Sequence, residues 1–354
     1  MKEKIYYLES LRGLAAITVC LFHFRFSSSI FLINNTFIQN GWIMVDFFFV
    51  LSGFVISYGY KDKLINLNNL FSFQFNRFIR LYPLHLITLL LFLNLEFLQF
   101  AKEYFTGVIG EGAAFTNNNF KNFFLNFFLV QALFNNDLTF NNPSWSISTE
   151  FFTYLLYGLI IIFFKKTYSS ILIFLCIVIL TSLILKGEIQ YSNQLSIFRC
   201  MFSFFLGCIV CYSRDIIKIS INSFFVYLSF LISIYLILNL INIQNLFLPI
   251  SFSLLIFSLI SSDKDLLIKK LLNNNILIFI GKISYGIYMI HYFVWITIEQ
   301  ITVLIGIGDP SKKYLYEPIL GIIILLIGLF TIIFLSYLSY EFFEKKIMKY
   351  RKRF

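Results

Sequence analysis

The sequence predicts an all-α, polytopic integral membrane protein, and three observations support this prediction. Of its 354 residues, 59% are hydrophobic and 13% are charged, whereas about a quarter of a soluble protein is charged. Apolar stretches of about twenty residues, the length of a bilayer-spanning helix, recur along the chain. No polar segment is long enough to form a separate soluble domain, so residues 1–354 are expected to form a single membrane-embedded domain.

About ten transmembrane helices follow from this length rule. They are expected at residues 9–27, 42–60, 81–100, 145–164, 170–186, 196–212, 222–241, 244–261, 279–300 and 318–338. A further apolar stretch at 123–134 is short for a complete span and is interpreted as re-entrant or partial. The first stretch has no small-residue cleavage site and follows the acidic Glu9, so it is expected to be a retained helix rather than a signal peptide.

The net charge of +10 indicates orientation rather than nucleic-acid binding. If the N-terminus is cytoplasmic, 21 of the 28 Lys and Arg residues fall on the cytoplasmic side of these spans and 7 on the other side. The positive-inside rule then places both chain ends in the cytoplasm. The protein is therefore expected to be a multi-pass protein of the inner or plasma membrane.

Ionisable residues inside apolar spans are costly and by default indicate function. Arg12 and His23 lie eleven residues apart, which is about 20° more than three helical turns, so they share one helix face about 16 Å apart. Arg12 is expected at the cytoplasmic end and His23 in the outer half of the membrane. The alternative interpretation is an interfacial anchor and a histidine that is bonded to a neighbouring helix.

Asp46 begins the stretch "DFFFVLSG" and is expected just below the outer surface. At that depth its carboxylate could meet His23 and fix the tautomer of the imidazole ring. An interfacial location is the alternative for Asp46. Gly53, in the same span, is expected to permit the close approach of another helix.

Glu150 lies in "NNPSWSISTEFF", where Asn142 is interpreted as a helix N-cap and Pro143 as the first helical residue. The glutamate then lies about two turns inside the span, one turn after Ser146 on the same face. A carboxylate at that depth needs a partner or a wet cavity.

The stretch "GKISYGIYMIHYF" places Ser284, Tyr288 and His291 on one helical stripe, with Tyr285 displaced to the side. His291 is expected at about the level of His23. An aromatic packing face is the alternative interpretation in a chain with 47 Phe and 21 Tyr residues.

Arg77 and Arg80, in "FQFNRFIRLYPLH", are expected in the first inner loop. Their spacing lets both point in one direction, and paired guanidinium groups match phosphate oxygens. Positive-inside anchoring is the alternative for each charge. His85 carries no clear assignment, and the five cysteines are interpreted as small apolar fillers rather than a metal or redox site.

Together these depths predict two polar groups of residues. Three arginines would lie at the cytoplasmic face, namely Arg12, Arg77 and Arg80. Two histidines and two carboxylates would lie deeper in the membrane, namely His23, His291, Asp46 and Glu150. This arrangement suits a long phosphorylated donor whose reactive end enters the bilayer.

The same motifs resemble those of the acyltransferase family 3 membrane proteins, the sugar O-acyltransferases of bacterial surfaces. Five motifs occur in the expected order between Leu8 and Tyr350: the Arg–ten residues–His pattern, "DFFFVLSG", the R-x-x-R pair, "WSISTE" and "SYGIYMIH". The resemblance implies transfer of an acetyl or larger acyl group from cytoplasmic acetyl-CoA or another acyl-CoA. The acceptor would be a carbohydrate hydroxyl, of a surface glycan or its lipid-linked precursor. Lys346 stands where the family often has a proline.

For the site, the resemblance implies that Arg12 and His23 are essential and that Arg77 and Arg80 serve the donor. We expect donor binding by Arg12, Arg77, Arg80, Ser284 and Tyr285, and catalysis by His23, Asp46, Glu150, Tyr288 and His291, without a metal. His23 would act as general base and Asp46 or Glu150 would orient it. Tyr288 and His291 would polarise the thioester or position the acceptor, and an acyl-histidine intermediate is an alternative.

Two other classes fit an apolar chain with buried charges. A transporter or lipid flippase also uses intramembrane Arg, His and Asp, but the chain has no repeated halves and no pair of spans interrupted by Gly or Pro. A non-catalytic membrane scaffold leaves the shared face of Arg12 and His23 unexplained.

Overall fold

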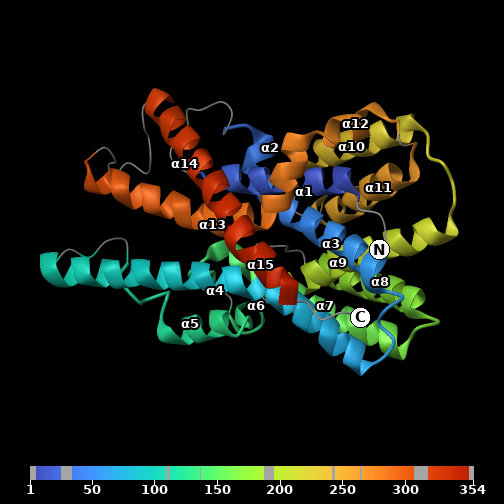
Figure 1. The fold of residues 1–354 in the computed structure, drawn as a ribbon, viewed down its shortest axis with the longest axis horizontal. Coiled ribbons are helices and arrows are strands. Elements are labelled where there is room, and N and C mark those ends of the chain that lie inside the picture. The colour runs from blue at the N-terminus through green and yellow to red at the C-terminus, as the bar shows by residue number, and fades with distance from the viewer. Residues whose placement is uncertain are drawn as a thin grey trace.

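The computed structural model describes residues 5–24, 34–107, 109, 112–135, 137–186, 195–240, 244–263, 265–306 and 318–350. These residues are helical apart from connecting segments, with one isolated β-bridge between Ile221 and Ser262. The helices form an elongated bundle in which α4 and α13 run side by side toward one end (Figure 1).

Each expected span coincides with a helix. These helices are α1 (Tyr6–Phe22), α3 (Met44–Tyr60), α4 (Leu67–Thr106), α7 (Trp145–Phe163), α8 (Tyr168–Lys186), α9 (Ser196–Ile216), α10 (Ser223–Leu238), α11 (Leu248–Ser261), α13 (Asn275–Leu304) and α14 (Pro318–Leu338). Within the described ranges, seven helical stretches are long and apolar enough to cross a membrane, those that contain α3, α4, α7, α8, α9, α13 and α14. The helices α1, α10 and α11 are shorter, so the count of ten and the orientation stay predictions.

Short elements connect these helices. They are α2 (Thr36–Gln39), η1 (Gly41–Ile43), α5 (Phe120–Phe127), α6 (Gln131–Phe134), η2 (Asn142–Ser144), η3 (Gln244–Leu246), α12 (Leu267–Leu272), the π-helical η5 (Ser339–Glu344), α15 (Lys345–Ile347) and η6 (Met348–Tyr350). The stretch at 123–134 is thus divided between α5 and α6, neither of which is long enough to cross a bilayer. Lys346, in place of a proline, lets the helical path continue through α15.

Helix α4 is much longer than the expected span at 81–100. Its 40 residues give about 60 Å of helix, against about 30 Å for the hydrocarbon core. It begins at Leu67, where the side chain of Asn66 accepts a hydrogen bond from the Asn69 amide. Neither Gly nor Pro occurs before Pro83 to end the helix. Arg77 and Arg80 therefore belong to α4 rather than to a separate loop, and they share one helical turn, as their spacing predicts.

The start of α7 also differs from the prediction. Asn142 is not its N-cap: Asn142 and Pro143 lie in the 3-10 turn η2, and α7 begins at Trp145. The Asn142 side chain instead donates a hydrogen bond to the Tyr292 hydroxyl of α13, at 2.8 Å. The turn thereby fastens the start of α7 to α13.

Two close helix crossings hold the bundle together. A Cβ atom on Gly53 of α3 would lie 1.9 Å from the Phe204 carbonyl oxygen of α9, and one on Gly207 would lie 1.9 Å from the Val50 oxygen. The expectation that Gly53 permits close approach is confirmed. Gly13 of α1 is in similar backbone contact with Gly281 of α13.

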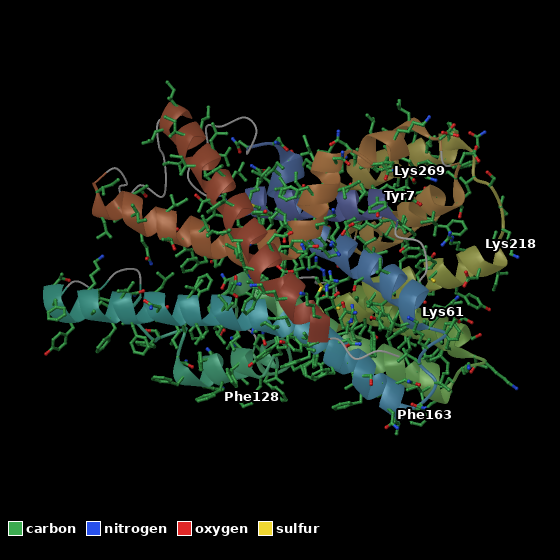
Figure 2. The ribbon with its side chains drawn as sticks, viewed as in Figure 1. Tyr7, Lys61, Phe128, Phe163, Lys218 and Lys269 are labelled. Carbon is green, nitrogen blue, oxygen red and sulfur yellow. The ribbon has the colours of Figure 1, made fainter. Side chains whose placement is uncertain are left out.

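The outer surface is strongly apolar. Phe128 and Phe163, each 65% exposed, lie along the edge of the molecule in Figure 2. Lys61 and Lys218 lie toward one end of the bundle in the same view. An apolar surface of this kind is that of a protein surrounded by lipid.

Candidate active site

The crossing of α1 and α13 fixes Arg12. Its Nε atom donates to Ser284 Oγ at 2.9 Å, and one terminal nitrogen donates to the Gly281 carbonyl oxygen at 2.8 Å. Glu9, one turn earlier on α1, lies 3.7 Å from the same nitrogen. The Arg12 side chain is 28% exposed, so it is anchored on one side and accessible on the other. Ser284 is thus brought to Arg12, a contact that was not predicted.

Further charges surround this end of α1. Arg80 lies close enough to interact electrostatically with Arg12, Glu150 and Glu344. The hydroxyl of Tyr285 donates to the Leu81 carbonyl oxygen at 2.5 Å, which fastens α13 to α4 beside Arg80. This group of residues, with Arg12, is called the arginine cluster below: Glu9, Arg12, Arg80, Glu150, Ser284, Tyr285 and Glu344.

Arg77 is placed differently from Arg80. It is 7% exposed, and its terminal nitrogen donates to the Tyr60 hydroxyl at 2.9 Å. Its guanidinium carbon lies 5.1 Å from the centre of the Tyr60 ring and 5.8 Å from that of Phe73. Arg80 is only half-buried. The two arginines both act on Glu150, but Arg77 is enclosed by aromatic rings, whereas Arg80 also acts on Arg12 and Glu344.

Glu150 has hydroxyl partners rather than a histidine partner among the contacts described. Its Oε1 accepts from the Tyr154 hydroxyl at 2.5 Å, and that hydroxyl lies 2.8 Å from Ser52 Oγ. Glu150 therefore belongs to the arginine cluster.

The other end of α1 carries a pair of histidines. His291 Nε2 lies 3.2 Å from His23 Nδ1, with ring centres 5.0 Å apart. His23 Nδ1 also lies 3.0 Å from the Val19 carbonyl oxygen, and His291 Nδ1 lies 3.0 Å from that of Ile287. The prediction that these histidines share a level is consistent with this contact.

The carbonyl partners assign the protons of both rings. A carbonyl oxygen only accepts hydrogen bonds, so Nδ1 of each neutral ring carries the hydrogen. The His23 Nδ1–H is then shared between Val19 and the lone pair of His291 Nε2. In this tautomer His23 Nε2 holds a lone pair and can act as a base. His23 is half-buried, whereas His291 is completely buried.

Tyr288 braces His291 against the start of α7. Its hydroxyl donates to the Pro143 carbonyl oxygen at 2.8 Å and lies 2.8 Å from Ser146 Oγ. The rings of Tyr288 and His291 have centres 6.0 Å apart. Tyr288 is thus beside the histidine pair, with its hydroxyl committed to backbone and serine partners.

The predicted pairing of Asp46 with His23 is wrong. Both oxygens of Asp46 are taken by Arg199 of α9, whose Nε lies 2.9 and 3.1 Å away and whose terminal nitrogen also contacts Oδ2. Ser203 donates to the same carboxylate at 3.2 Å. Asp46 is 1% and Arg199 5% exposed. A guanidinium matches a carboxylate in shape and charge, which an imidazole does not, so Arg199 holds this position.

No functional role was predicted for Arg199 from the sequence. Its place one turn inside an apolar span, at the depth of Asp46, was the available signal. The roles of Tyr154, Asn142 and Tyr292 were also missed, because hydroxyl and amide side chains are too common in this chain to stand out.

The remaining histidine and the cysteines have structural surroundings. His85 is 1% exposed, and its Nε2 lies 2.9 Å from the Asn126 carbonyl oxygen. All five cysteines are free and buried. In the part of the chain that the structure describes, no three His, Cys, Asp or Glu side chains gather in a way that could hold a metal ion.

Comparison with known proteins points to one family. Residues 5–341 match a family model described as an acyltransferase domain. The curated protein acyltransferase MdmB of Streptomyces mycarofaciens is 33% identical over 122 residues, which is 34% of this chain and 28% of that protein. The match thus spans less than a third of the relative's length. No solved structure matches the chain.

Proposed function

The chain belongs to acyltransferase family 3, and from that premise we propose that it transfers an acyl group, in the simplest case acetyl, from cytoplasmic acyl-CoA to a carbohydrate hydroxyl. The observation that carries this proposal is the pair of His23 and His291 at one end of α1, with Arg12 fixed at the other end. An acid–base group and an anion-binding group thus stand on one helix. A family of acyltransferases favours an enzyme over the transporter or scaffold alternatives.

The arginine cluster is the proposed site for the phosphates of the donor. Arg12 keeps an exposed side, and Arg80 is half-buried beside it. The exposed Lys282 and Lys346 each lie two residues in the sequence from a member of the cluster, Ser284 and Glu344 respectively. Guanidinium groups bind phosphate through paired hydrogen bonds. Ser284 and Tyr285 then serve the donor by holding Arg12 and α4 in place, and Arg77 supports the cluster from its aromatic enclosure.

His23 is the proposed general base. Its Nε2 takes the proton of the acceptor hydroxyl while that oxygen attacks the carbonyl carbon of the thioester. The C–S bond breaks, the electron pair leaves with the CoA sulfur, and the imidazolium returns the proton to that thiolate. His291 Nε2 accepts from His23 Nδ1 and stabilises the imidazolium, the role that a carboxylate has in a serine-protease triad.

The carboxylates have other roles in this proposal. Asp46 holds α3 to α9 through Arg199, and Glu150 balances the positive charge of the arginine cluster. Tyr288 positions His291. The alternative order, in which His23 first takes the acyl group itself, remains open to a direct test. Radiolabelled acetyl-CoA without acceptor would leave label on the protein only in that order.

The function is tested by mass spectrometry of the surface polysaccharide from a deletion strain. The strain is complemented with wild type, with His23→Ala or with the control His85→Gln, each at verified expression. We expect the acetyl increment to be lost in the deletion and in His23→Ala and kept in the control. Removing a general base lowers the rate about 10²- to 10⁴-fold. Full transfer by His23→Ala would refute the mechanism, and an unchanged glycan in every strain would refute that acceptor.

A further inference from the structure

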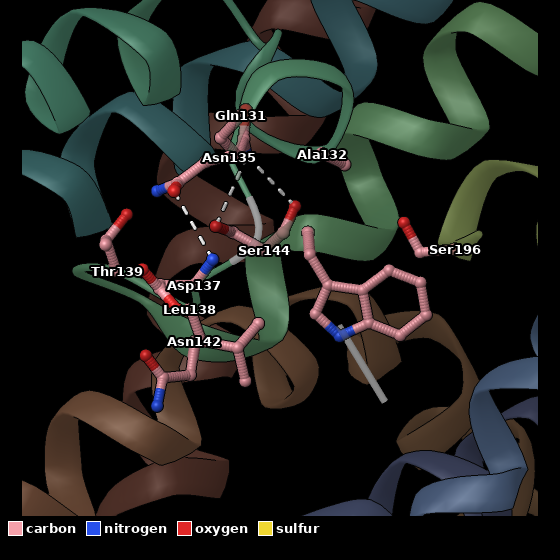
Figure 3. Close-up of a pocket in the computed structure, with 10 residues that line it drawn as sticks. Gln131, Ala132, Asn135, Asp137, Leu138, Thr139, Asn142, Ser144 and Ser196 are labelled. Atoms are coloured by element: carbon pink, nitrogen blue, oxygen red, sulfur yellow. Dashed lines mark hydrogen bonds between the residues drawn. The ribbon is translucent and has the colours of Figure 1, made fainter. Parts of the chain in front are cut away.

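A groove lies between α10 and α11 on the apolar surface of the bundle. Its volume is about 540 Å³, within the range of about 300–1,000 Å³ that is usual for small-molecule sites. By contrast, the polar hollow beside the start of α7 (Figure 3) measures about 10 Å³, enough for one water molecule. Of these two hollows, the α10–α11 groove is therefore the one that can take a ligand.

Small serine side chains form the floor of the groove. Ser229 Oγ of α10 lies 2.9 Å from Ser258 Oγ of α11, and Ser233 donates to Ser251 Oγ at 3.3 Å. Each of these four hydroxyls also lies 2.7–3.0 Å from a carbonyl oxygen of its own helix. The hydroxyls are thus satisfied within the two helices, and the groove presents an apolar surface to its occupant.

Large apolar side chains form the walls. They are Phe225, Leu228 and Ile232 of α10 and Leu254 and Phe257 of α11. Phe225 is 57% and Leu254 is 54% exposed, so the groove opens onto the outer surface of the bundle. Because that surface is the apolar one that faces lipid, the medium in contact with the groove is hydrocarbon.

The length of the groove fits one leaflet of a bilayer. From Phe225 to Ile232 it follows α10 for about 10 Å of helix rise. Residues 219–222, before the start of α10, lengthen it further. One leaflet has a hydrocarbon depth of about 15 Å, which is half of the bilayer core. A single lipid chain that runs along α10 therefore matches the groove.

The end of the groove at the start of α10 is polar. Ser220 and Asn222 line it, and Ser220 donates to Asp263 Oδ1 at 3.1 Å. Lys218, which precedes the lining residue Ile219, is exposed at one end of the bundle in Figure 2. Asp263 is exposed as well. A positive and a negative side chain thus flank this end of the groove.

We propose that the groove binds one acyl chain of a membrane phospholipid whose headgroup carries a primary ammonium, as in phosphatidylethanolamine. The chain lies along the serine floor, the phosphate faces Lys218, and the ammonium donates to Asp263. A polyisoprenyl phosphate has no such cation, and the Asp263 carboxylate would repel its phosphate. None of the lining residues belongs to the arginine cluster or to the histidine pair, so the lipid is a partner of α10 and α11 and not a reactant.

The test is native mass spectrometry of the full-length protein, delipidated in detergent and then titrated with phosphatidylethanolamine. The wild type should bind one phospholipid. Ile232→Trp fills the groove and should weaken binding at least about tenfold, because excluding only two methylene groups has that effect. The matched control is Ile234→Trp, since Ile234 is 41% exposed against 40% for Ile232 and lies outside the groove on the same helix. No phospholipid on the wild type, or equal binding by the two variants, would overturn the proposal.

The headgroup is tested with phosphatidylethanolamine and phosphatidylcholine that have the same chains. The quaternary ammonium of choline has no N–H to donate, so the wild type should bind phosphatidylethanolamine about tenfold more tightly. Asp263→Asn should reduce this preference, whereas Asp265→Asn, which removes an exposed carboxylate outside the groove, should keep it. Equal binding of the two lipids by the wild type would refute the ammonium contact. These measurements need no acyl transfer, so their result does not depend on the proposed function.

Discussion

Replacing His291 by phenylalanine removes the nitrogen that accepts a hydrogen bond from His23 and keeps a flat ring. In the wild type the two nitrogens are 3.2 Å apart, and Val19 also holds the His23 Nδ1 hydrogen at 3.0 Å. The tautomer should therefore survive in the variant, and only the stabilisation of the imidazolium is lost. A hydrogen bond to a charged group contributes about 1.5–3 kcal/mol, so kcat should fall about 10- to 150-fold.

The assay is acetyl-CoA turnover by purified protein in nanodiscs, with His291→Gln as the matched variant. The Oε1 atom of glutamine can take the place of His291 Nε2, so His291→Gln should recover most of the lost kcat. The KM for acetyl-CoA should stay unchanged in both variants because the arginine cluster is at the other end of α1. Equal losses of kcat in the two variants, or no loss in His291→Phe, would refute the positioning role.

Three other predictions follow from the contacts. Asp46→Ala should destabilise the protein by about 3–5 kcal/mol because it leaves Arg199 buried and unpaired. The double variant Asp46→Leu with Arg199→Leu should destabilise the protein less. Thermal unfolding in detergent measures both effects. Gly53→Ala should prevent normal folding, since its Cβ would lie 1.9 Å from a carbonyl oxygen. Gly59→Ala should fold, because no atom lies within 4 Å of the added Cβ. Size-exclusion profiles of the two variants test this difference. Arg12→Lys keeps the charge but cannot make both wild-type hydrogen bonds, so kcat/KM for acetyl-CoA should fall at least about tenfold, and an unchanged value would contradict a donor role.

The positions of the helices could be predicted because bilayer thickness fixes how many apolar residues a span needs. The contact between His23 and His291 was also within reach of the sequence. Each residue lies at a definite depth on a long apolar helix, and polar side chains at equal depth tend to find each other. The sequence supplies these depths but says little about rotation, so Asp46, at a similar depth, was assigned to His23 although it faces α9.

The residues at which α4 and α7 begin could not be predicted in the same way. The segment before Pro83 is helical by pattern, but its charges and amides read equally well as a loop. Asn142 satisfies the composition of an N-cap, yet its amide is used between α7 and α13. In both places a tertiary contact decides among local structures that are nearly equal in free energy.

The crossing of α1 and α13 explains how the two polar ends can work together. Gly13 and Gly281 bring the backbones into contact, and each end of the pair is closed by a side-chain bond, Arg12 to Ser284 and His291 to His23. Two helices bonded at both ends keep the distance between their ends nearly constant. A donor whose phosphates are bound at Arg12 then presents its thioester at a fixed depth. The distance between its phosphates and its thioester must therefore match the roughly 16 Å between Arg12 and His23. On this view, binding energy from the phosphates contributes to kcat as well as to KM, since it positions the reacting carbonyl beside the base.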